Sequence, residues 1–159
     1  PFKNCTFEYV FSEHQIEELG YEASVAMLRE CHRVLRPGGG LRVATTSLDA
    51  LLALGADSKS ELQLEYIKWI TDQYLPEIGI YSESFVINNA FHRSGKRFLF
   101  DQETLWGAME QAGFVEITRC AHGVSERPAF QKIERHGVSV SNESMANFET
   151  MVLQGIRPT

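Results

Sequence analysis

The segment LRPGGGLRVAT, residues 35–45, decides the fold of this chain. Its Pro-Gly-Gly-Gly run stops a helix, and the run after it, residues 41–45, has the composition of a strand. Before the stop, apolar residues recur at helical spacing from Tyr21 to Leu35. Before that helix, the aromatic segment FEYVF, residues 7–11, predicts another strand. Strand, helix, glycine turn and strand make a βαβ unit, so we expect two parallel strands.

The remainder of the chain continues the alternation of helices and strands, which predicts one α/β domain over residues 1–159. A capping-box pattern at Ser60 and an N-cap aspartate at Asp101 mark two helix starts, and the first of these helices has an aromatic apolar face. The predicted elements are a helix from Ser60 to Pro76, a helix from Asp101 to Gly113, a strand over 114–120, a short helix at about 130–136 and a strand over 148–153. Residues 76–97 lose this periodicity, which predicts a long loop or short elements.

Composition excludes several classes of protein. With 159 residues, 43% of them hydrophobic, the chain can bury the core of one domain. The 15 Lys and Arg against 21 Asp and Glu give a net charge of −6, which argues against nucleic acid as a partner. No segment is apolar enough for a membrane span or a signal peptide. Cys5, Cys31 and Cys120 are an odd number within apolar segments, so we expect free core thiols and a cytoplasmic location.

A cluster of chemically active side chains, SEHQIEE at residues 12–18, directly follows the first predicted strand. In open α/β sheets the ligand crevice lies beyond the carboxyl ends of parallel strands, so this position favours a binding role. The alternative for Glu17 and Glu18 is a favourable place at a helix start, where carboxylates meet the positive end of the dipole. The alternative for Ser12, Glu13 and His14 is a solvated loop. The sequence leaves both interpretations open.

Other chemistries find less support. The spacing His14-x-x-Glu17-Glu18 is close to the H-x-x-E-H zinc motif but lacks its second imidazole. The later histidines have no mutual ligand spacing, so we predict no metal site. The chain contains no G-x-S-x-G motif, and the glycines at 38–40 precede a strand without the Lys-Ser/Thr of a phosphate loop.

A second polar cluster lies in the segment that lacks periodicity. Its donors and cations suit an anionic or polyhydroxyl ligand, and the residues are Asn88, Asn89, His92, Arg93, Lys96 and Arg97. A lid over the crevice and a solvated loop are both compatible with this composition.

Taken together, these segments resemble the C-terminal half of a class I S-adenosylmethionine-dependent methyltransferase. The resemblance rests on FEYVFSEHQIEEL at 7–19, LRECHRVLRPGG at 28–39, LRVAT at 41–45, KRFLFDQETL at 96–105 and AGF at 112–114. The family implies a Rossmann-like α/β fold, in which these segments would supply the fourth to seventh strands. The implied architecture is a mixed sheet of order 4-5-7-6 with flanking helices and an inserted helical cap at about 55–97.

The resemblance also implies a function, namely methyl transfer from S-adenosylmethionine to an unidentified small polar or anionic acceptor. It places the methionine part of the cofactor and its sulfonium against Phe11, Ser12, Glu13 and His14. His14 is then the predicted proton acceptor, with His92 as the second candidate. The predicted acceptor-binding residues are Asn88, Asn89, His92, Arg93 and Lys96.

The sequence departs from this family where the cofactor is mainly held. The glycine-rich loop after the family's first strand and the acidic residue ending its second strand are both absent from this sequence. We therefore expect the complete protein to bind S-adenosylmethionine, whereas this chain alone binds it weakly and is inactive or nearly so.

The alternative function is a non-catalytic α/β module that dimerises or binds a partner. Without a first strand beside it, the segment Phe7–Phe11 would be an aromatic sheet edge with unpaired backbone groups. Two copies related by a twofold axis could join these edges into one continuous sheet. We therefore expect a homodimer that pairs through this strand.

Overall fold

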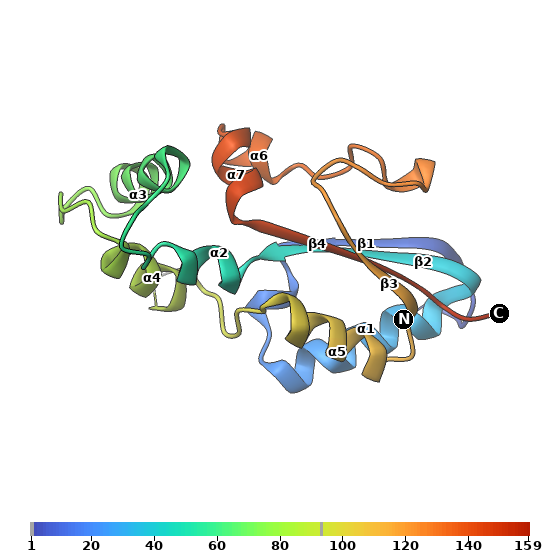
Figure 1. Cartoon of the computed structure of the whole chain (residues 1–159). Coiled ribbons are helices and arrows are strands. Elements are labelled where there is room, and N and C mark those ends of the chain that lie inside the picture. The colour runs from blue at the N-terminus through green and yellow to red at the C-terminus, as the bar shows by residue number, and fades with distance from the viewer. Residues whose placement is uncertain (1, 93) are drawn as a thin grey trace.

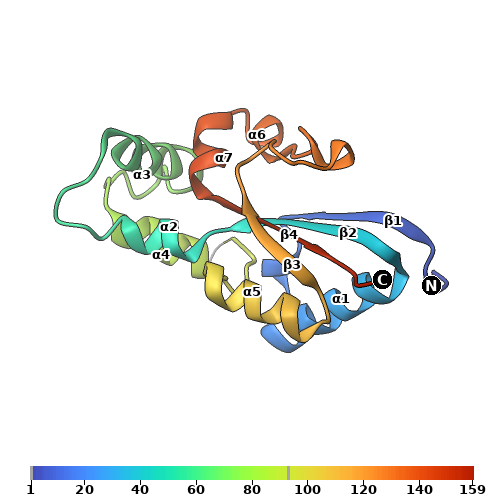
Figure 2. The same ribbon diagram turned by 45° about the vertical axis from the view of Figure 1, so that its right-hand side comes forward.

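A computed structural model describes residues 2–92 and 94–159 as a sheet with flanking helices. The strands are β1 (Phe7–Glu13), β2 (Leu35–Thr46), β3 (Val115–Cys120) and β4 (Thr150–Ile156). They lie in the order β1-β2-β4-β3, with β1 parallel to β2 and β4 antiparallel to both of its neighbours. Figure 2 shows β4, the last strand in the chain, lying inside the sheet.

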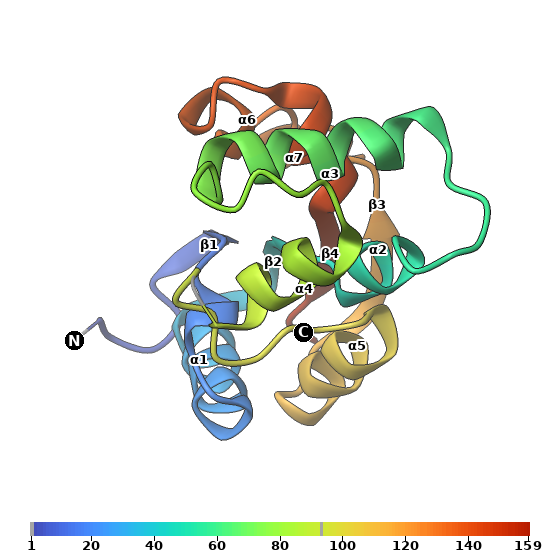
Figure 3. The ribbon, with the colours of Figure 1, turned by 90° about the vertical axis from the view of Figure 1, so that its left-hand side faces the viewer.

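The helices divide among three places around the sheet. They are α1 (Tyr21–Val34), α2 (Leu48–Ala53), α3 (Glu61–Tyr74), α4 (Glu83–His92), α5 (Gln102–Gln111), α6 (His136–Ser139) and α7 (Glu143–Glu149). Helices α1 and α5 cover one face, and α6 and α7 lie over the other (Figure 1). Helices α2, α3 and α4 extend beyond one end of the sheet, opposite the two chain termini (Figures 1 and 3). Within the described residues, no helix is long and apolar enough to cross a membrane.

The main hydrophobic core lies between the sheet and the pair of helices α1 and α5. Leu28 of α1, Met109 of α5 and Val43 of β2 are completely buried in it. Alternation along β2 turns Leu41 and Val43 toward this core and Arg42 toward the opposite face. Each of these buried aliphatic side chains contributes about 1.5–3 kcal/mol to folding.

A separate hydrophobic cluster joins α3 and α4 at the end of the sheet. Tyr66 and Ile70 of α3 pack with Val86 of α4, and Met145 of α7 belongs to the same cluster. Helix α3 begins with the predicted capping box, in which the side chains of Ser60 and its partner three residues later satisfy each other's backbone N–H groups. This second cluster fixes α3 and α4 beyond the strand ends.

The segment without periodicity, residues 76–97, for which the sequence predicts a long loop or short elements, contains the ten-residue helix α4. Its residues Val86 and Ala90 are buried, and its other residues are partly buried or exposed. Such a narrow buried stripe leaves little periodicity in the sequence, which is why the helix was not predicted.

The Pro-Gly-Gly-Gly run does not form a separate turn before the strand. Helix α1 ends directly before Leu35, where β2 begins, so the run is the first part of β2. Pairing with β1 is irregular between Leu35 and Gly40, which makes this stretch a bulge. Gly38 has a φ of +74°, and a Cβ on Gly39 would lie 2.7 Å from a backbone oxygen. The bulge therefore requires glycine at both positions.

Two predictions near the C-terminus are wrong in their boundaries. The segment 130–136 is not a helix, because a 3-10 turn ends at Phe130 and α6 begins at His136. The last strand begins at Thr150 instead of Phe148, because the end of α7 takes up Phe148.

The three cysteines are free, but they are not all in the core. Cys5 is exposed, so the core prediction is wrong for it, and Cys31 and Cys120 are only partly buried. Burial and the nearby Glu30 carboxylate raise the pKa of the Cys31 thiol to about 11.

A completely buried ion pair holds the loop between β3 and α6 on the sheet. Arg42 of β2 pairs with Glu134, and both side chains are fully enclosed. Arg42 also donates to the carbonyl oxygens of Val124, at 3.0 Å, and Ala121, at 3.2 Å. Glu134 accepts the backbone N–H of Gly123 at 3.1 Å. The pair is thus enclosed by hydrogen bonds to the loop that it fixes.

We predict that Glu134→Ala lowers the free energy of unfolding by about 3–5 kcal/mol, because it leaves the Arg42 guanidinium buried without a counter-charge. Urea unfolding followed by circular dichroism measures this loss. The exposed pair of Arg36 and Glu8 provides the control, since Glu8→Ala should cost less than about 1 kcal/mol. Equal losses from the two substitutions would contradict the assignment.

Candidate active site

Where β1 ends, His14 and Glu17 form a hydrogen-bonded pair. His14 follows the last residue of β1 and has a φ of +48°, a left-handed backbone conformation that histidine adopts more readily than most residues. A 3-10 turn over Ile16–Glu18 then brings Glu17 back beside the end of β2. The Nδ1 atom of His14 and Oε1 of Glu17 are 2.7 Å apart.

The buried carboxylate of Glu17 is surrounded by hydrogen-bond donors. The Thr45 hydroxyl donates to it at 2.6 Å, the Thr46 hydroxyl at 3.2 Å and the Thr46 backbone N–H at 3.3 Å. Burial acts to raise the pKa of Glu17, but the hydrogen bonds and charge from His14, together with Thr45, lower it to about 2. Glu17 is therefore ionised at neutral pH and orients the His14 ring.

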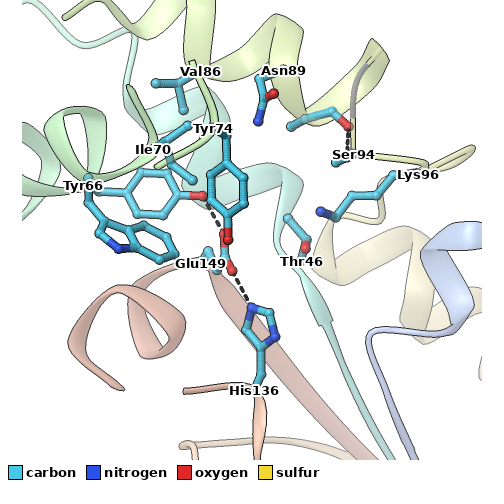
Figure 4. A pocket seen from close by; sticks show the side chains of 12 residues that line it. Thr46, Tyr66, Ile70, Tyr74, Val86, Asn89, Ser94, Lys96, His136 and Glu149 are labelled. Carbon is cyan, nitrogen blue, oxygen red and sulfur yellow. Dashed lines mark hydrogen bonds and ion pairs between the residues drawn. The ribbon is translucent and has the colours of Figure 1, made fainter. Parts of the chain in front are cut away.

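A second imidazole–carboxylate pair comes from the C-terminal part of the chain. The Nε2 atom of His136 lies 2.8 Å from Oε1 of Glu149, and the Tyr66 hydroxyl donates to Oε2 of Glu149 at 2.5 Å (Figure 4). Burial opposes ionisation of Glu149, but hydrogen bonds from His136 and Tyr66 bring its pKa below the usual value. Burial and the charge of Glu149 raise the pKa of Tyr66 well above its usual value, so its hydroxyl remains a donor.

The two pairs meet through their imidazole rings. The ring centroids of His14 and His136 are 3.9 Å apart, with 38° between the ring planes. Glu13 supports this contact, because its carboxylate accepts the backbone N–H groups of Arg135, at 2.9 and 3.0 Å, and His136, at 3.0 Å. The end of β1 thus fixes the start of α6.

The pair of His136 and Glu149 borders a pocket of about 510 Å³. Thr46, the last residue of β2, lines the pocket, and helices α3 and α4 supply more of its lining. Its lining residues are Thr46, Tyr66, Trp69, Ile70, Tyr74, Val86, Asn89, Ala90, Ser94, Lys96, His136 and Glu149. In Figure 4, the polar ends of Asn89 and Lys96 point into this space. The pocket therefore combines an aromatic wall, a cation, an amide and an imidazole–carboxylate pair.

The structure brings part of the predicted acceptor site to this pocket. Asn89 and Lys96 line it, as their cluster suggested. Asn88 is exposed and donates its side-chain amide to the carbonyl of Ser84 at 2.8 Å. His92 is exposed at the end of α4 and is not among the lining residues. Arg93 lies outside the described residues.

The four residues predicted to contact a cofactor lie along the end of β1. Ser12 is buried, and its Oγ has no hydrogen-bond partner among the described residues. Phe11 is partly buried and pairs with Arg42 across the strands. The Glu13 carboxylate is engaged by backbone N–H groups, and His14 is held by Glu17.

Sequence reasoning missed both residues of the second pair and the Tyr66 hydroxyl that donates to it. His136 and Glu149 come from short helices in a segment without a motif, and Tyr66 was assigned only to the apolar face of its helix. The unusual aromatic content of that face was the one available signal, because an aromatic hydroxyl is buried only with a partner.

Comparisons with known proteins identify the fold. No known family model matches the sequence, and no curated protein sequence matches it either. Among solved structures, a possible exported protein from Bordetella parapertussis is 11% identical, with a TM-score of 0.55 over 99% of this chain and 41% of that chain. A SAM-dependent methyltransferase from Archaeoglobus fulgidus is 11% identical, with a TM-score of 0.51 over 98% of this chain and 61% of that chain.

A third similar structure is a SAM-dependent methyltransferase from Thermotoga maritima, described as a possible histamine N-methyltransferase. It is 18% identical, with a TM-score of 0.50 over 99% of this chain and 59% of that chain. At such identities the similarity shows the fold alone, which is the mixed α/β, Rossmann-like fold of SAM-dependent methyltransferases. The chain spans between 41% and 61% of the length of these three chains.

The low pKa of Glu17 predicts an acid-dependent stability. Its pKa is 4.5 in the unfolded chain and about 2 in the folded one, so ionised Glu17 stabilises the fold above pH 4.5. That contribution, on the order of 3 kcal/mol, disappears as the pH falls from 4.5 to about 2. Urea unfolding of the wild type and of Glu17→Gln at a series of pH values should give curves that converge in this range.

The neighbouring substitution Glu18→Gln is the matched control, because Glu18 is exposed and its carboxylate accepts the Gln15 side-chain amide at 3.1 Å. Its unfolding should follow that of the wild type at every pH. A constant difference between wild type and Glu17→Gln across the acid range would show that the charge of Glu17 is not what stabilises the fold.

Proposed function

We propose that the complete protein is an S-adenosylmethionine-dependent methyltransferase, to which this chain contributes the methyl-acceptor pocket. The observation that carries the proposal is the pocket bordered by His136 and Glu149 at the carboxyl ends of β1 and β2. Ligands of open α/β sheets bind at this end of the strands. The methyltransferase fold of the chain supplies the class of reaction.

In this proposal, the strands β1, β2, β4 and β3 correspond to positions 4, 5, 7 and 6 of the class I methyltransferase sheet. The order of the strands and the antiparallel direction of β4 support the correspondence. Helices α3 and α4 would then be a cap inserted over about 55–97, and the remaining cofactor contacts would come from residues outside this chain.

The end of β1 offers a partial fit to the cofactor. Ser12 has a buried hydroxyl without a partner among the described residues, and Phe11 offers a partly exposed ring. Glu13 fits less well, because its carboxylate already accepts the N–H groups at the start of α6. S-adenosylmethionine would supply an electrophilic methyl group on a sulfonium. In this arrangement Phe11, Ser12 and His14 contact the cofactor and Glu13 positions His136.

The pocket suits a small acceptor with a polar or anionic group. Its volume of about 510 Å³ is that of an ordinary small-molecule site. The Lys96 ammonium and the Asn89 amide would bind the polar group, while Trp69 and Tyr74 would cover the apolar part. An oxygen or nitrogen acceptor must also lose a proton during methyl transfer.

We assign proton removal to the stacked imidazoles. His14, the residue predicted from the sequence, is oriented by Glu17, and His136 is oriented by Glu149 at the pocket wall. The contact between the rings lets both take part in one site. His92 is the weaker candidate, because it is exposed and does not line the pocket.

In the complete protein, Lys96→Met should raise the KM for the acceptor roughly tenfold or more, because a charged hydrogen bond is lost. Transfer of labelled methyl groups to a panel of small polar and anionic acceptors measures this effect. Asn88→Ala is the control, because the Asn88 side chain points away to Ser84 and should leave KM unchanged.

Calorimetric titration with S-adenosylhomocysteine tests cofactor binding separately from acceptor binding. Its affinity should be the same for the wild type and for Lys96→Met. If Lys96→Met weakens cofactor binding, the acceptor assignment is wrong. If the complete protein binds neither S-adenosylmethionine nor S-adenosylhomocysteine, the methyltransferase proposal is wrong.

One observation favours the second candidate, a module that dimerises or binds a partner. Strand β1 is an edge of the sheet, and an apolar hollow of about 360 Å³ lies beside it. The hollow is lined by Phe2, Phe7, Tyr9, Val10, Glu30, Cys31 and Val34. We propose that a second copy of the chain pairs through Phe7–Phe11 and covers this hollow.

The 159-residue chain should therefore sediment as a dimer at micromolar concentration. Tyr9→Pro removes a backbone donor in the edge strand and should shift the chain to a monomer. Circular dichroism of the variant establishes that the fold is retained. A monomeric wild type, or a dimer that persists in the folded Tyr9→Pro variant, would contradict the β1 interface.

A further inference from the structure

We propose that His14, His136 and Glu149 form a binding site for one divalent transition-metal ion, with zinc as the foremost candidate. The two histidines and the carboxylate each offer one ligand atom, and these atoms lie within 4.8 Å of one another. Two imidazole nitrogens and one carboxylate oxygen are a ligand set that zinc sites use. The site goes beyond methyl transfer, and it does not rest on the proposed function.

The spacing of the ligand atoms is close to what one ion requires. Two ligands at about 2.1 Å from a tetrahedral ion lie about 3.4 Å apart. The Nε2 atom of His136 and Oε1 of Glu149 are 2.8 Å apart, and the rings of His14 and His136 have centroids separated by 3.9 Å. Because 2.8 Å is a hydrogen-bond distance, Nε2 of His136 and Oε1 of Glu149 would have to move apart by about 0.6 Å to share an ion, and small side-chain rotations would bring all three ligand atoms to that spacing.

Hydrogen bonds behind the ligands orient them as in metal centres. Glu17 lies 2.7 Å from Nδ1 of His14, while the Nε2 of His14 lies 3.3 Å from the Thr150 hydroxyl, its one hydrogen-bond partner among residues 2–92 and 94–159. A carboxylate behind one ring nitrogen, with the other nitrogen turned outward, is the usual support of a metal-binding histidine. On Glu149, Oε2 accepts the Tyr66 hydroxyl, and Oε1, which is hydrogen-bonded to Nε2 of His136 at 2.8 Å, would exchange that hydrogen bond for a bond to the ion.

The backbone fixes the three ligands from separate segments. His14 follows β1, His136 begins α6 and Glu149 ends α7. The Glu13 carboxylate ties the start of α6 to the end of β1, through the backbone N–H of His136. The second imidazole, missing from the spacing of His14 and its neighbours, thus comes from a distant part of the chain.

Three protein ligands leave a coordination position toward the pocket, since both His136 and Glu149 line it. An ion there would lower the pKa of a hydroxyl group or water molecule bound to it.

The positive charge of Lys96 opposes such an ion. Lys96 lines the same pocket as Glu149, and its amino group points into it (Figure 4). Replacement of this ammonium by an apolar side chain should therefore raise the affinity for a metal ion. If the role of Glu149 were instead to neutralise the charge of Lys96, the same replacement would not create tighter metal binding.

The test is calorimetric titration of the chelator-treated protein with Zn²⁺, and with Co²⁺ for its visible absorption bands, in the absence of cofactor and acceptor. We expect one ion per chain. His136→Ala and Glu149→Gln should abolish stoichiometric binding, and Glu17→Gln should weaken it about 10–100-fold. Lys96→Met should strengthen it, and His92→Ala, which removes an exposed imidazole, should leave it unchanged.

Circular dichroism and thermal unfolding of each variant distinguish a lost ligand from a lost fold, and Glu149→Gln retains an oxygen that accepts the Tyr66 hydroxyl. The proposal is overturned if the wild type binds no stoichiometric metal ion. It is also overturned if folded His136→Ala binds Zn²⁺ as tightly as the wild type, or if only His92→Ala loses binding. If the complete protein binds S-adenosylhomocysteine but no metal ion, the metal-site inference alone is wrong. If it binds a metal ion but not S-adenosylhomocysteine, the methyltransferase proposal alone is wrong.

Discussion

The buried ion pair of Arg42 and Glu134 is the constraint on which the rest of this structure depends. Two charges removed from water are stable together only if their remaining hydrogen-bonding groups are also satisfied. Arg42 meets this condition by binding the carbonyl oxygens of Ala121 and Val124. The loop after β3 is thereby held on the sheet, and the chain leaves it at the position where His136 meets the end of β1. Neither member of the pair lines the pocket, but Glu134 fixes the segment directly before His136, which does.

The parts of the fold that depend on local chemistry could be predicted from the sequence. The parallel pairing of β1 and β2, the capping box at Ser60 and the N-cap at Asp101 all follow from a few neighbouring residues, and the structure confirms them. Helix α4 was missed because tertiary packing covers only a narrow stripe of it. The early start of β2 was missed because the bulge at its glycines exists only through pairing with β1.

The same distinction between local chemistry and tertiary packing applies to the candidate site. Topology alone placed residues 12–18 at the strand end, and there Glu17 is buried among donors while Glu18 is exposed. Glu17 lies in the first turn of the 3-10 helix, the position that the sequence had left open, and its carboxylate also has buried donors from the end of β2. His136, Glu149 and Tyr66 could not be predicted, because their contacts join segments far apart in the chain and no spacing records them. Short-range pattern locates one half of the site, and the other half depends on the docking of α6 and α7.

The position of β4 has a consequence for how the molecule forms. Strand β3 is made before β4 but contacts the rest of the sheet only through it, since β4 lies between β2 and β3. During synthesis, β2 therefore presents an open edge until the residues of β4 have left the ribosome. Contacts between such distant residues form slowly, and an open edge can pair with another chain in the meantime. Assembly of the pocket is tied to this last step, because Glu149 directly precedes β4. The pocket is therefore incomplete until β4 is paired between β2 and β3.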